Sequence, residues 1–192
     1  MMGDLFAAAD ARHSLFFALL PGAAAAAAIR AARQALEAGQ PPQRGAGVPD
    51  ERLHLTLHWL GEWSQLPQAL ADDARAAAAQ VRQAGFVLRL DQAECFGRGE
   101  AIWVLRPSAP PPALERLHQA LATALAGRRI RLPAGPAFAP HVTVRRRASV
   151  RFPVQPVAPV DWRVDGFALL QSVHGSGGVR YEVLQRWPLA AE

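Results

Sequence analysis

The chain contains no lysine: all 21 basic residues among its 192 are arginines. Without lysine there is no Schiff-base nucleophile and no lysyl–nucleotide intermediate of the kind that ATP-driven ligases form. The phosphate-binding lysine of a Walker motif is absent as well. These classes of covalent and ATP-dependent catalysis are therefore excluded.

Cysteine is nearly absent too, because Cys95 stands alone. No internal disulfide can form, so we expect a reducing compartment and a small buried side chain rather than a nucleophile. No eighteen apolar residues run uninterrupted, which predicts no membrane span. The first twelve residues carry Asp4 and Asp10 and lack the order of a signal peptide. We therefore expect a cytoplasmic protein.

Composition favours one globular unit, since half of the residues (51%) are hydrophobic. We expect residues 1–12 to be a flexible tail and residues 13–192 to form a single domain. The formal net charge of +5 gives slight support to an anionic partner.

Helices are predicted where alanine-rich or amphipathic stretches end at glycine, over residues 23–38, 64–84 and 113–126. Strands are predicted where short apolar runs or alternating patterns stop at glycine or proline, over residues 14–20, 53–60, 86–91, 101–106, the stretch from 141, 161–171 and 177–187. Residues 152–160, which are spaced by prolines, are expected to form a connector.

A histidine and a threonine two residues apart occur twice, at His54 and Thr56 and again at His141 and Thr143. A strand and a helix precede each copy at nearly the same spacing, which indicates a duplication with repeats of about 13–92 and 100–190. We predict an α+β fold of two pseudo-symmetric lobes, with antiparallel strands and outer helices around a central cleft.

Two imidazoles across a cleft suit acid–base catalysis near neutral pH, one taking a proton and the other giving one. The threonine hydroxyls can donate hydrogen bonds to an anion between them. The arginines at 145–147 follow the second motif and can neutralise phosphate charge. This combination fits in-line displacement at phosphorus without a metal.

The other histidines are weaker candidates. His58 is expected on the same strand face as His54, but it lies ~13 Å away, too far for both to bind one zinc ion. We therefore expect no metal site. We expect His13 and His118 to be structural. His174 falls in a glycine-rich loop that can border the cleft, although we do not expect it to be catalytic.

Five tryptophans are expected to pack in the core or between the lobes. A single aromatic side chain can also serve as a stacking platform for a nucleobase, and the candidates for that role are Phe96 and Trp103.

Taken in order, these stretches resemble the two-histidine phosphoesterase superfamily, and within it the bacterial and archaeal RNA 2′,3′-cyclic phosphodiesterases, historically called 2′-5′ RNA ligases. The matching stretches are SLFFALLP at 14–21, RLHLTLHWLGE at 52–62, the segment from Phe96 to Trp103, FAPHVTVRR at 138–146 and FALLQSVHGSGGVRYEVLQRWPL at 167–189. They span nearly the whole chain after residue 12.

The resemblance implies a bilobal fold and hydrolysis of a 2′,3′-cyclic phosphate RNA end to a 2′-phosphate, with expulsion of the 3′ oxygen. By position, His54 is similar to the family's proton donor and His141 to its proton acceptor, while Thr56 and Thr143 would hold phosphate oxygens. The family needs no cofactor, and its site can join RNA ends through a 2′-5′ linkage without ATP.

One position departs from the family pattern. The family commonly has a small residue and then a phosphate-contacting arginine after the second motif, and these align with Arg145 and Arg146. Strict strand alternation instead places Arg145 on the face of His141 and Thr143. We expect Arg146 to be the binding residue, which requires the strand to end or bulge after Val144.

Two other functions stay open at this point. One is a 2′,5′-oligonucleotide phosphodiesterase that uses the same residues, and the other is a non-catalytic module that binds RNA ends. In each case the expected partner is an RNA or nucleotide end with a 2′,3′-cyclic phosphate or a related phosphodiester. We expect no membrane, no obligate protein partner and a monomer.

Overall fold

Within the residues that the computed structural model describes, 12–175 and 178–191, eight strands form one sheet whose order differs from their order along the chain. The sheet runs β6-β3-β4-β5-β2-β1-β7-β8, and all neighbouring strands are antiparallel. The strands are β1 (Arg12–Leu19), β2 (Leu55–Trp63), β3 (Phe86–Phe96), β4 (Ala101–Arg106), β5 (Val142–Ala148), β6 (Gln155–Val164), β7 (Gly166–Gly175) and β8 (Gly178–Pro188).

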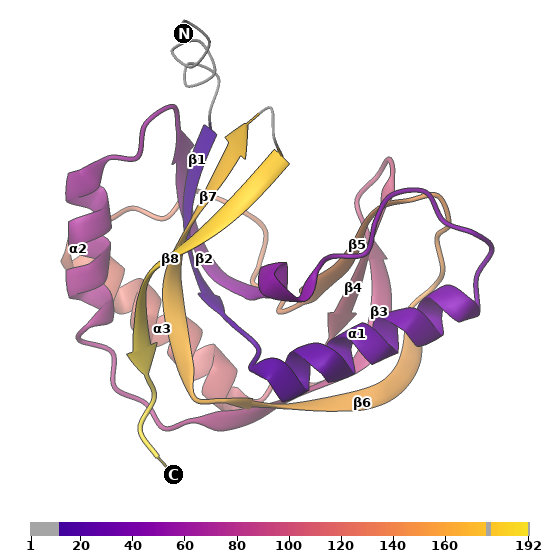
Figure 1. The fold of residues 1–192 in the computed structure, drawn as a ribbon. Coiled ribbons are helices and arrows are strands. Elements are labelled where there is room, and N and C mark those ends of the chain that lie inside the picture. The colour runs from indigo at the N-terminus through magenta and orange to yellow at the C-terminus, as the bar shows by residue number, and fades with distance from the viewer. Residues whose placement is uncertain (1–11, 176–177, 192) are drawn as a thin grey trace, which may run out of the picture.

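The described helices are α1 (Ala23–Ala38), α2 (Gln68–Ala78), α3 (Pro112–Gly127) and a short 3-10 helix, η1 (Asp50–Arg52). The fold is therefore α+β, as predicted. Each long helix packs across the molecule from the strand that precedes it. The helix α1 follows β1 but contacts β6 and β5, whereas α3 follows β4 and contacts α2, β2 and β3 (Figure 1). None of the described helices has the length and apolar character needed to cross a membrane.

The pairing also crosses the expected repeat boundary at residue 92. The strand β3 pairs with β4 and β6, while β7 and β8 pair with each other and, through β7, with β1. The two motif strands, β2 and β5, lie side by side in the middle of the sheet. Each half of the sheet thus combines strands that are far apart in the sequence.

The predicted helix over residues 23–38 is confirmed at both ends, and the helix predicted over 113–126 is one residue longer at each end. The helix predicted over 64–84 is too long. It begins only after Pro67, which disfavours helical backbone at the residue before it, and it ends at Ala78. Beyond Ala78, the carbonyl oxygen of Gln83 accepts a hydrogen bond from the backbone N–H of Ala190. This segment therefore pairs with the end of the described chain and does not continue the helix.

Two strand predictions are wrong. Residues 152–160 are not merely a connector, because β6 begins at Gln155 and includes two prolines; β6 is an edge strand, where a missing N–H is tolerated. The single strand predicted over 161–171 belongs to two strands in opposite halves of the sheet, β6 and β7, divided at Asp165. The predicted tail at 1–12 lies outside the described residues except for Arg12, which begins β1.

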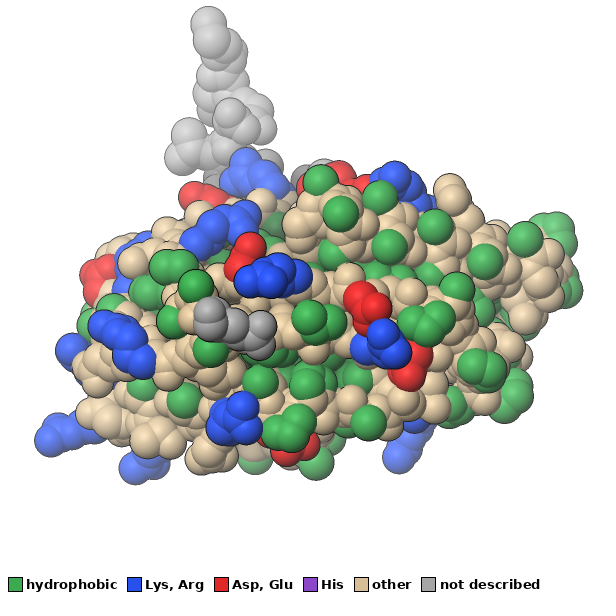
Figure 2. Space-filling view, turned by 90° about the horizontal axis from the view of Figure 1, so that it is seen from below, with side chains coloured by type: hydrophobic (Ala, Val, Ile, Leu, Met, Phe, Trp, Pro, Cys, Tyr) green, Lys and Arg blue, Asp and Glu red, His purple; other side chains and the backbone are tan. Residues whose placement is uncertain are grey.

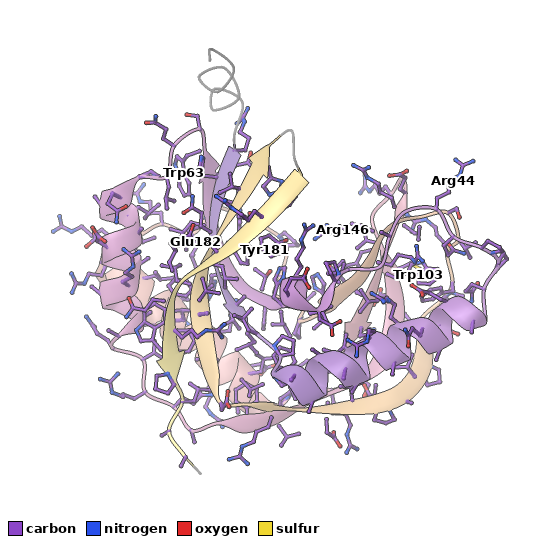
Figure 3. All side chains as sticks on the ribbon, viewed as in Figure 1. Arg44, Trp63, Trp103, Arg146, Tyr181 and Glu182 are labelled. Carbon is purple, nitrogen blue, oxygen red and sulfur yellow. The ribbon has the colours of Figure 1, made fainter. Side chains whose placement is uncertain are left out.

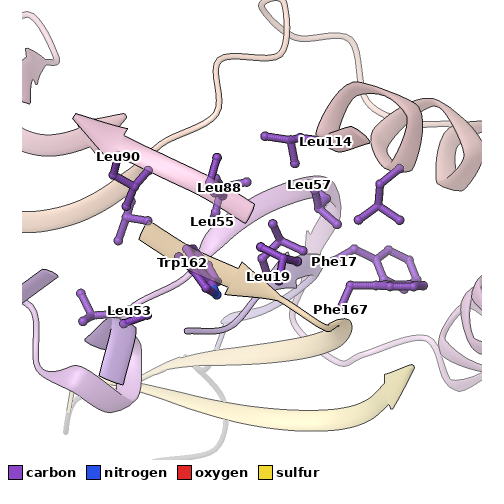
Figure 4. Packing of buried hydrophobic residues seen from close by; sticks show 14 of the residues in the cluster. Phe17, Leu19, Leu53, Leu55, Leu57, Leu88, Leu90, Leu114, Trp162 and Phe167 are labelled. Carbon is purple, nitrogen blue, oxygen red and sulfur yellow. The ribbon is translucent and has the colours of Figure 1, made fainter. Parts of the chain in front are cut away.

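The main core lies between the sheet and the helices (Figure 4). It contains Phe17, Leu19 and Leu55 from the central strands, Leu114 from α3 and Trp162 from β6, all nearly or fully buried. A smaller cluster on the opposite sheet face is formed by Phe16, Ala18, Ala168 and Leu170. The sheet therefore has one helix-covered face and one face that remains open to the site.

Tryptophans mostly follow the prediction, since Trp103 and Trp162 are buried and Trp63 and Trp187 pack against the core. The prediction is wrong for Trp59, whose residue surface is 47% exposed. The cause is a register shift between β1 and β2, where β2 contains an extra residue at Leu57. Cys95 is half-buried, and burial raises the pKa of its thiol, so it stays protonated at neutral pH.

Charged side chains are mixed on the surface. Seen from below the view of Figure 1, arginine side chains lie beside acidic ones, with apolar side chains between them (Figure 2). The net positive charge is therefore not gathered on that face.

Candidate active site

The two motif histidines occupy matching positions. His54 lies one residue before β2 and His141 one residue before β5. In each ring Nδ1 lies 2.7 Å from the carbonyl oxygen two residues earlier, that of Arg52 or Ala139. Because a carbonyl can only accept, the neutral ring carries its proton on Nδ1 and donates it. The Nε2 atom of each ring is then left for proton transfer.

Aromatic rings hold both imidazoles from the side. The centroid of His54 lies 5.3 Å from that of Phe16 and 5.3 Å from that of Tyr181, the latter at an interplanar angle of 89°. His141 meets Phe96 edge-on at 4.8 Å. These contacts restrict rotation of the rings about the Nδ1 hydrogen bond.

The register of the central strands places each histidine beside the other motif's threonine. β2 and β5 pair at Leu55 and Val142, which are fully buried. Continuing that antiparallel register by one residue sets His54 across from Thr143 and Thr56 across from His141. Alternation turns all four side chains to the face opposite the core.

This register makes the two histidines diagonal neighbours on one face. Diagonal cross-strand neighbours lie about 7–8 Å apart. The spacing leaves room for a small anion between the two imidazoles, with a threonine hydroxyl on either side of it.

A pocket of about 600 Å³ opens beside this group. Its lining includes three of the predicted residues, His54, Thr143 and Arg146. His141 and Thr56 are not part of the lining, and they join the site through the strand register instead. The other described residues of the wall are Gly45, Ala46, Gly47, Val48, Pro49, Arg52, Arg147, His174, Val179 and Tyr181.

Arg145 and Arg146 point in different directions. In the pairing of β5 with β4, Thr143 pairs with Val104 but Arg145 pairs with Trp103, so β5 contains one extra residue between them. This bulge reverses the alternation. The guanidinium of Arg145 consequently lies 5.7 Å from the Trp103 ring centroid, on the core side of the sheet.

The contacts of the two arginines differ accordingly. Arg145 lies 3.1 Å from Glu37 of α1 and donates to the carbonyl oxygens of Arg44 and Gly45. Arg146 lines the pocket instead. Figure 3 shows it between the two halves of the sheet, near Tyr181.

Electrostatics favour neutral imidazoles in the free site. Burial is the main cause that lowers the pKa of His54, and the charges of Arg146 and His141 lower it further. Burial also lowers the pKa of His141, again with a contribution from Arg146, while Glu94 opposes the shift. A bound anion would raise both pKa values, because its charge stabilises the protonated rings.

His58 does not share the face of His54. In the pairing of β1 with β2, Thr56 pairs with Ala18 and His58 with Phe17, so β2 bulges at Leu57 and the alternation reverses. His58 therefore points into the core. Its Nε2 lies 2.8 Å from the carbonyl oxygen of His118, so the expectation that His118 is structural agrees with its position in the fold.

The remaining histidines lie on β1 and β7. His13 accepts a hydrogen bond from Gln171 at 2.6 Å, away from the pocket lining. His174 lies in β7 rather than in a loop, and it does border the pocket. In the described part of the chain, no group of three or more histidine, cysteine or acidic side chains is arranged to hold a metal ion.

The two candidate stacking residues, Trp103 and Phe96, differ in how far they are buried. Trp103 is fully buried and donates its indole N–H to the carbonyl of Val150 at 2.9 Å, which leaves no face for a nucleobase. Phe96 is half-buried and lies beside His141. Tyr181, the only tyrosine of the chain, was not singled out from the sequence, although it falls in a stretch that resembles the family.

A glycine-rich loop forms one wall of the pocket. The backbone N–H of Val48 donates to the carbonyl of Val144 at 2.8 Å, so the loop runs alongside β5. Gly45 has φ of +71°, and a Cβ there would collide with the carbonyl oxygen of Arg146. The sequence marked this stretch only as a loop, because its contact with β5 spans about a hundred residues.

Comparisons with known proteins identify the family of the chain. Residues 20–176 match the 2′-5′ RNA ligase superfamily. The chain is 36% identical over 152 residues to the RNA 2′,3′-cyclic phosphodiesterase of Escherichia coli, covering 78% of this chain and 82% of that protein. It is 32% identical over 176 residues to the corresponding protein of Thermus thermophilus, covering 85% and 86%.

Solved structures show the same fold. The Escherichia coli LigT protein in complex with 3′-AMP superposes with a TM-score of 0.75 at 32% identity, covering 93% of this chain and 99% of that one. The TT0787 protein of Thermus thermophilus gives a TM-score of 0.74 at 29% identity, covering 93% and 99%. The expected resemblance is confirmed, and the chain belongs to the 2′-5′ RNA ligase superfamily.

Proposed function

We propose that the protein hydrolyses RNA 2′,3′-cyclic phosphate ends to 2′-phosphates by metal-independent acid–base catalysis. The observation that carries this function is the pair of histidines, each fixed through Nδ1 at the start of one of the two paired central strands. Two curated relatives with the same activity in their names, from Escherichia coli and Thermus thermophilus, support it.

In the proposed reaction His141 accepts a proton from water, and the water oxygen attacks phosphorus in line with the bond to O3′. That bond breaks, and His54 donates its proton to O3′, so the product is a 2′-phosphate with a free 3′-hydroxyl. Thr56, Thr143 and Arg146 bind the non-bridging oxygens, whose negative charge grows in the transition state. No cofactor takes part.

The same steps allow ligation when a 5′-hydroxyl replaces water. Its oxygen then attacks phosphorus, O3′ leaves with the proton of His54, and a 2′-5′ phosphodiester results. The energy comes from opening the strained cyclic phosphate rather than from ATP, which agrees with the absence of lysine.

The site fits a single bilobal catalytic domain over residues 13–192 that acts as a monomer. One lobe consists of β8, β7, β1 and β2, and the other of β6, β3, β4 and β5. In this scheme β1, α1 and β2 correspond to β4, α3 and β5, and each lobe contributes one motif. The pseudo-twofold axis passes between Leu55 and Val142.

The direct test is to incubate the purified protein, in EDTA, with a short RNA that ends in a 2′,3′-cyclic phosphate. We expect complete conversion to the 2′-phosphate, resolved from the 3′-phosphate by chromatography. Faster cleavage of a linear 2′-5′ bond would identify a 2′,5′-phosphodiesterase instead. Salt-sensitive binding without turnover would identify an RNA-end binding module.

The pH dependence of kcat/KM should be bell-shaped. Activity falls at low pH when His141 becomes protonated and at high pH when His54 loses its proton. Because burial lowers both pKa values in the free protein, we expect the maximum of kcat/KM below pH 6.5. The kcat maximum should lie at higher pH, since bound phosphate raises both pKa values. A single rising limb from pH 5 to 9 would contradict paired histidines.

A further inference from the structure

Three arginines of the pocket wall have no acidic partner. Within the described chain no ion pair involves Arg52, Arg146 or Arg147, and no acidic side chain lines this pocket. Their neighbour Arg145, by contrast, is paired with Glu37. The pocket thus carries more positive charge than a single phosphate group needs.

The backbone at Arg147 is strained in a way that serves the pocket. Its φ is +57°, in the left-handed region that bulky residues rarely adopt. Here Ala101 pairs with Ala148 and Trp103 with Arg145, so both Arg146 and Arg147 lie opposite one residue of β4. The second bulge lets two consecutive arginines reach the same pocket, and such strain is concentrated at functional sites.

The pocket lies on the His54 side of the reacting phosphorus. Its lining includes His54 but not His141. In the proposed reaction His54 protonates O3′, which is a ribose atom, so the ribose lies on the His54 side and water on the His141 side. The rest of the RNA chain, joined through the 5′ oxygen of that ribose, therefore leaves through this pocket.

We propose that Arg52 and Arg147 bind the phosphodiester that links the terminal nucleotide to the one before it. This subsite rests on the proposed function and defines its substrate class, an oligonucleotide rather than a nucleoside 2′,3′-cyclic phosphate. Arg146 remains with the reacting phosphate, and Tyr181, whose ring also contacts that of His54, borders the same space.

The test compares two substrates that differ by one nucleotide and its phosphodiester: adenosine 2′,3′-cyclic phosphate and the diadenosine dinucleotide with the same cyclic end. The variants are Arg52→Ala, which removes the guanidinium but keeps the backbone carbonyl that holds His54, and Arg147→Gly, because glycine adopts the left-handed backbone freely. Arg163→Ala, an exposed arginine on β6, is the control. Each pocket variant should lower kcat/KM for the dinucleotide about tenfold, the loss expected for one charge-assisted contact, and for the nucleoside less than about twofold.

Equal losses on both substrates, or no loss on either, would overturn the subsite. The affinities of the two matching 2′-phosphate products, measured by calorimetry, test the same preference without turnover. If the unmodified protein hydrolysed neither substrate, the proposed reaction would fail, while an arginine-dependent preference for the dinucleotide product would still establish the subsite. No preference for the dinucleotide product in the unmodified protein, or a preference unchanged in both arginine variants, would refute the subsite by itself.

A second, independent observation concerns three stacked rings beneath the site. The rings of His58 and His118 lie 4.0 Å apart at 27°, and those of His118 and Phe138 lie 4.0 Å apart at 14°. Burial and the neighbouring His58 lower the pKa of His118 to about 4, so its ring is neutral near pH 7. The stack behaves as three aromatic rings in contact.

This stack connects both motifs through α3. His58 lies on β2, four residues after His54, and His118 belongs to α3. Phe138 precedes Ala139, whose carbonyl accepts the Nδ1–H of His141. The direct pairing of β2 and β5 is limited to one residue pair. The stack is therefore a second connection between the segments that carry the two histidines.

We infer that His118 and Phe138 are positioning residues that hold the carbonyl of Ala139 where His141 requires it. Two variants separate positioning from simple packing. His118→Leu keeps an apolar side chain but removes the flat ring, and His118→Phe keeps the flat ring but removes the nitrogens. Folding is checked by urea denaturation of both.

His118→Leu should lower kcat about tenfold, a fraction of the contribution of a positioned base, with KM within about twofold of the unmodified value. His118→Phe should restore kcat. Unchanged kcat in His118→Leu would overturn the inference. So would an equal loss of kcat in both variants, or a loss that simply follows the fraction of unfolded protein.

Discussion

Replacement of either motif histidine by alanine is expected to lower kcat for cyclic phosphate hydrolysis by about 10²–10⁴, the usual contribution of one positioned acid or base. His54→Ala removes the proton for O3′, and His141→Ala removes the group that activates water. The double variant should lose little more than the worse single variant, because the two act in one step. Steady-state assays with a cyclic-phosphate dinucleotide measure all three.

Folding should survive these changes. Neither ring is part of the main core, and each makes one hydrogen bond to a nearby carbonyl. His13→Ala is the control, since His13 lies outside the pocket lining. Urea denaturation midpoints close to the unmodified value, together with the kinetic loss, would support the assignment. Full activity in either single variant would refute it.

Arg146→Ala should lower activity and Arg145→Ala should lower stability, although the two residues are adjacent. Loss of Arg146 should lower kcat/KM by about 10²–10³, the range for removing one group that stabilises developing charge. Loss of Arg145 should leave kcat/KM within about threefold of normal. Its guanidinium is paired with Glu37 and two backbone carbonyls, so its removal should cost about 1–3 kcal/mol of unfolding free energy.

The two measurements for this pair are kcat/KM and urea denaturation. Arg145→Lys, which keeps the charge but not the fork of donors, should recover only part of the lost stability. The orientation of the pair would be refuted if Arg145→Ala lost activity at unchanged stability while Arg146→Ala kept full activity.

Local features of the fold were predictable from sequence. The helix over residues 23–38 follows from an alanine-rich stretch without proline or glycine between Gly22 and Gly39, and the motifs stand out because histidine and threonine recur at one spacing. The choice of Arg146 over Arg145 followed from the family pattern, since strict alternation favours Arg145. The bulge that reconciles the two depends on pairing with β4.

Features set by distant contacts were not predictable. Regular alternation turns His58 towards the site and Trp59 towards the core, and the bulge at Leu57 reverses both. Proline marks β6 as irregular, yet the edge of a sheet accepts it. Arg52 and Tyr181 join the pocket only because η1 and β8 meet there, although they lie far apart along the chain.

The interleaved sheet also decides when the site can form. Residues 12–18 pair with residues 168–174, so the strand that precedes the first motif has its outer neighbour only after nearly the whole chain has been synthesised. Contacts of such long sequence separation form slowly, because the intervening chain must first be closed into a loop. In a nascent chain that ends before β7, Phe16 and Ala18 of β1 lack their apolar neighbours on β7, and His54 lacks the Tyr181 ring beside it. The protein should therefore gain its catalytic pocket only after β7 and β8 have been synthesised.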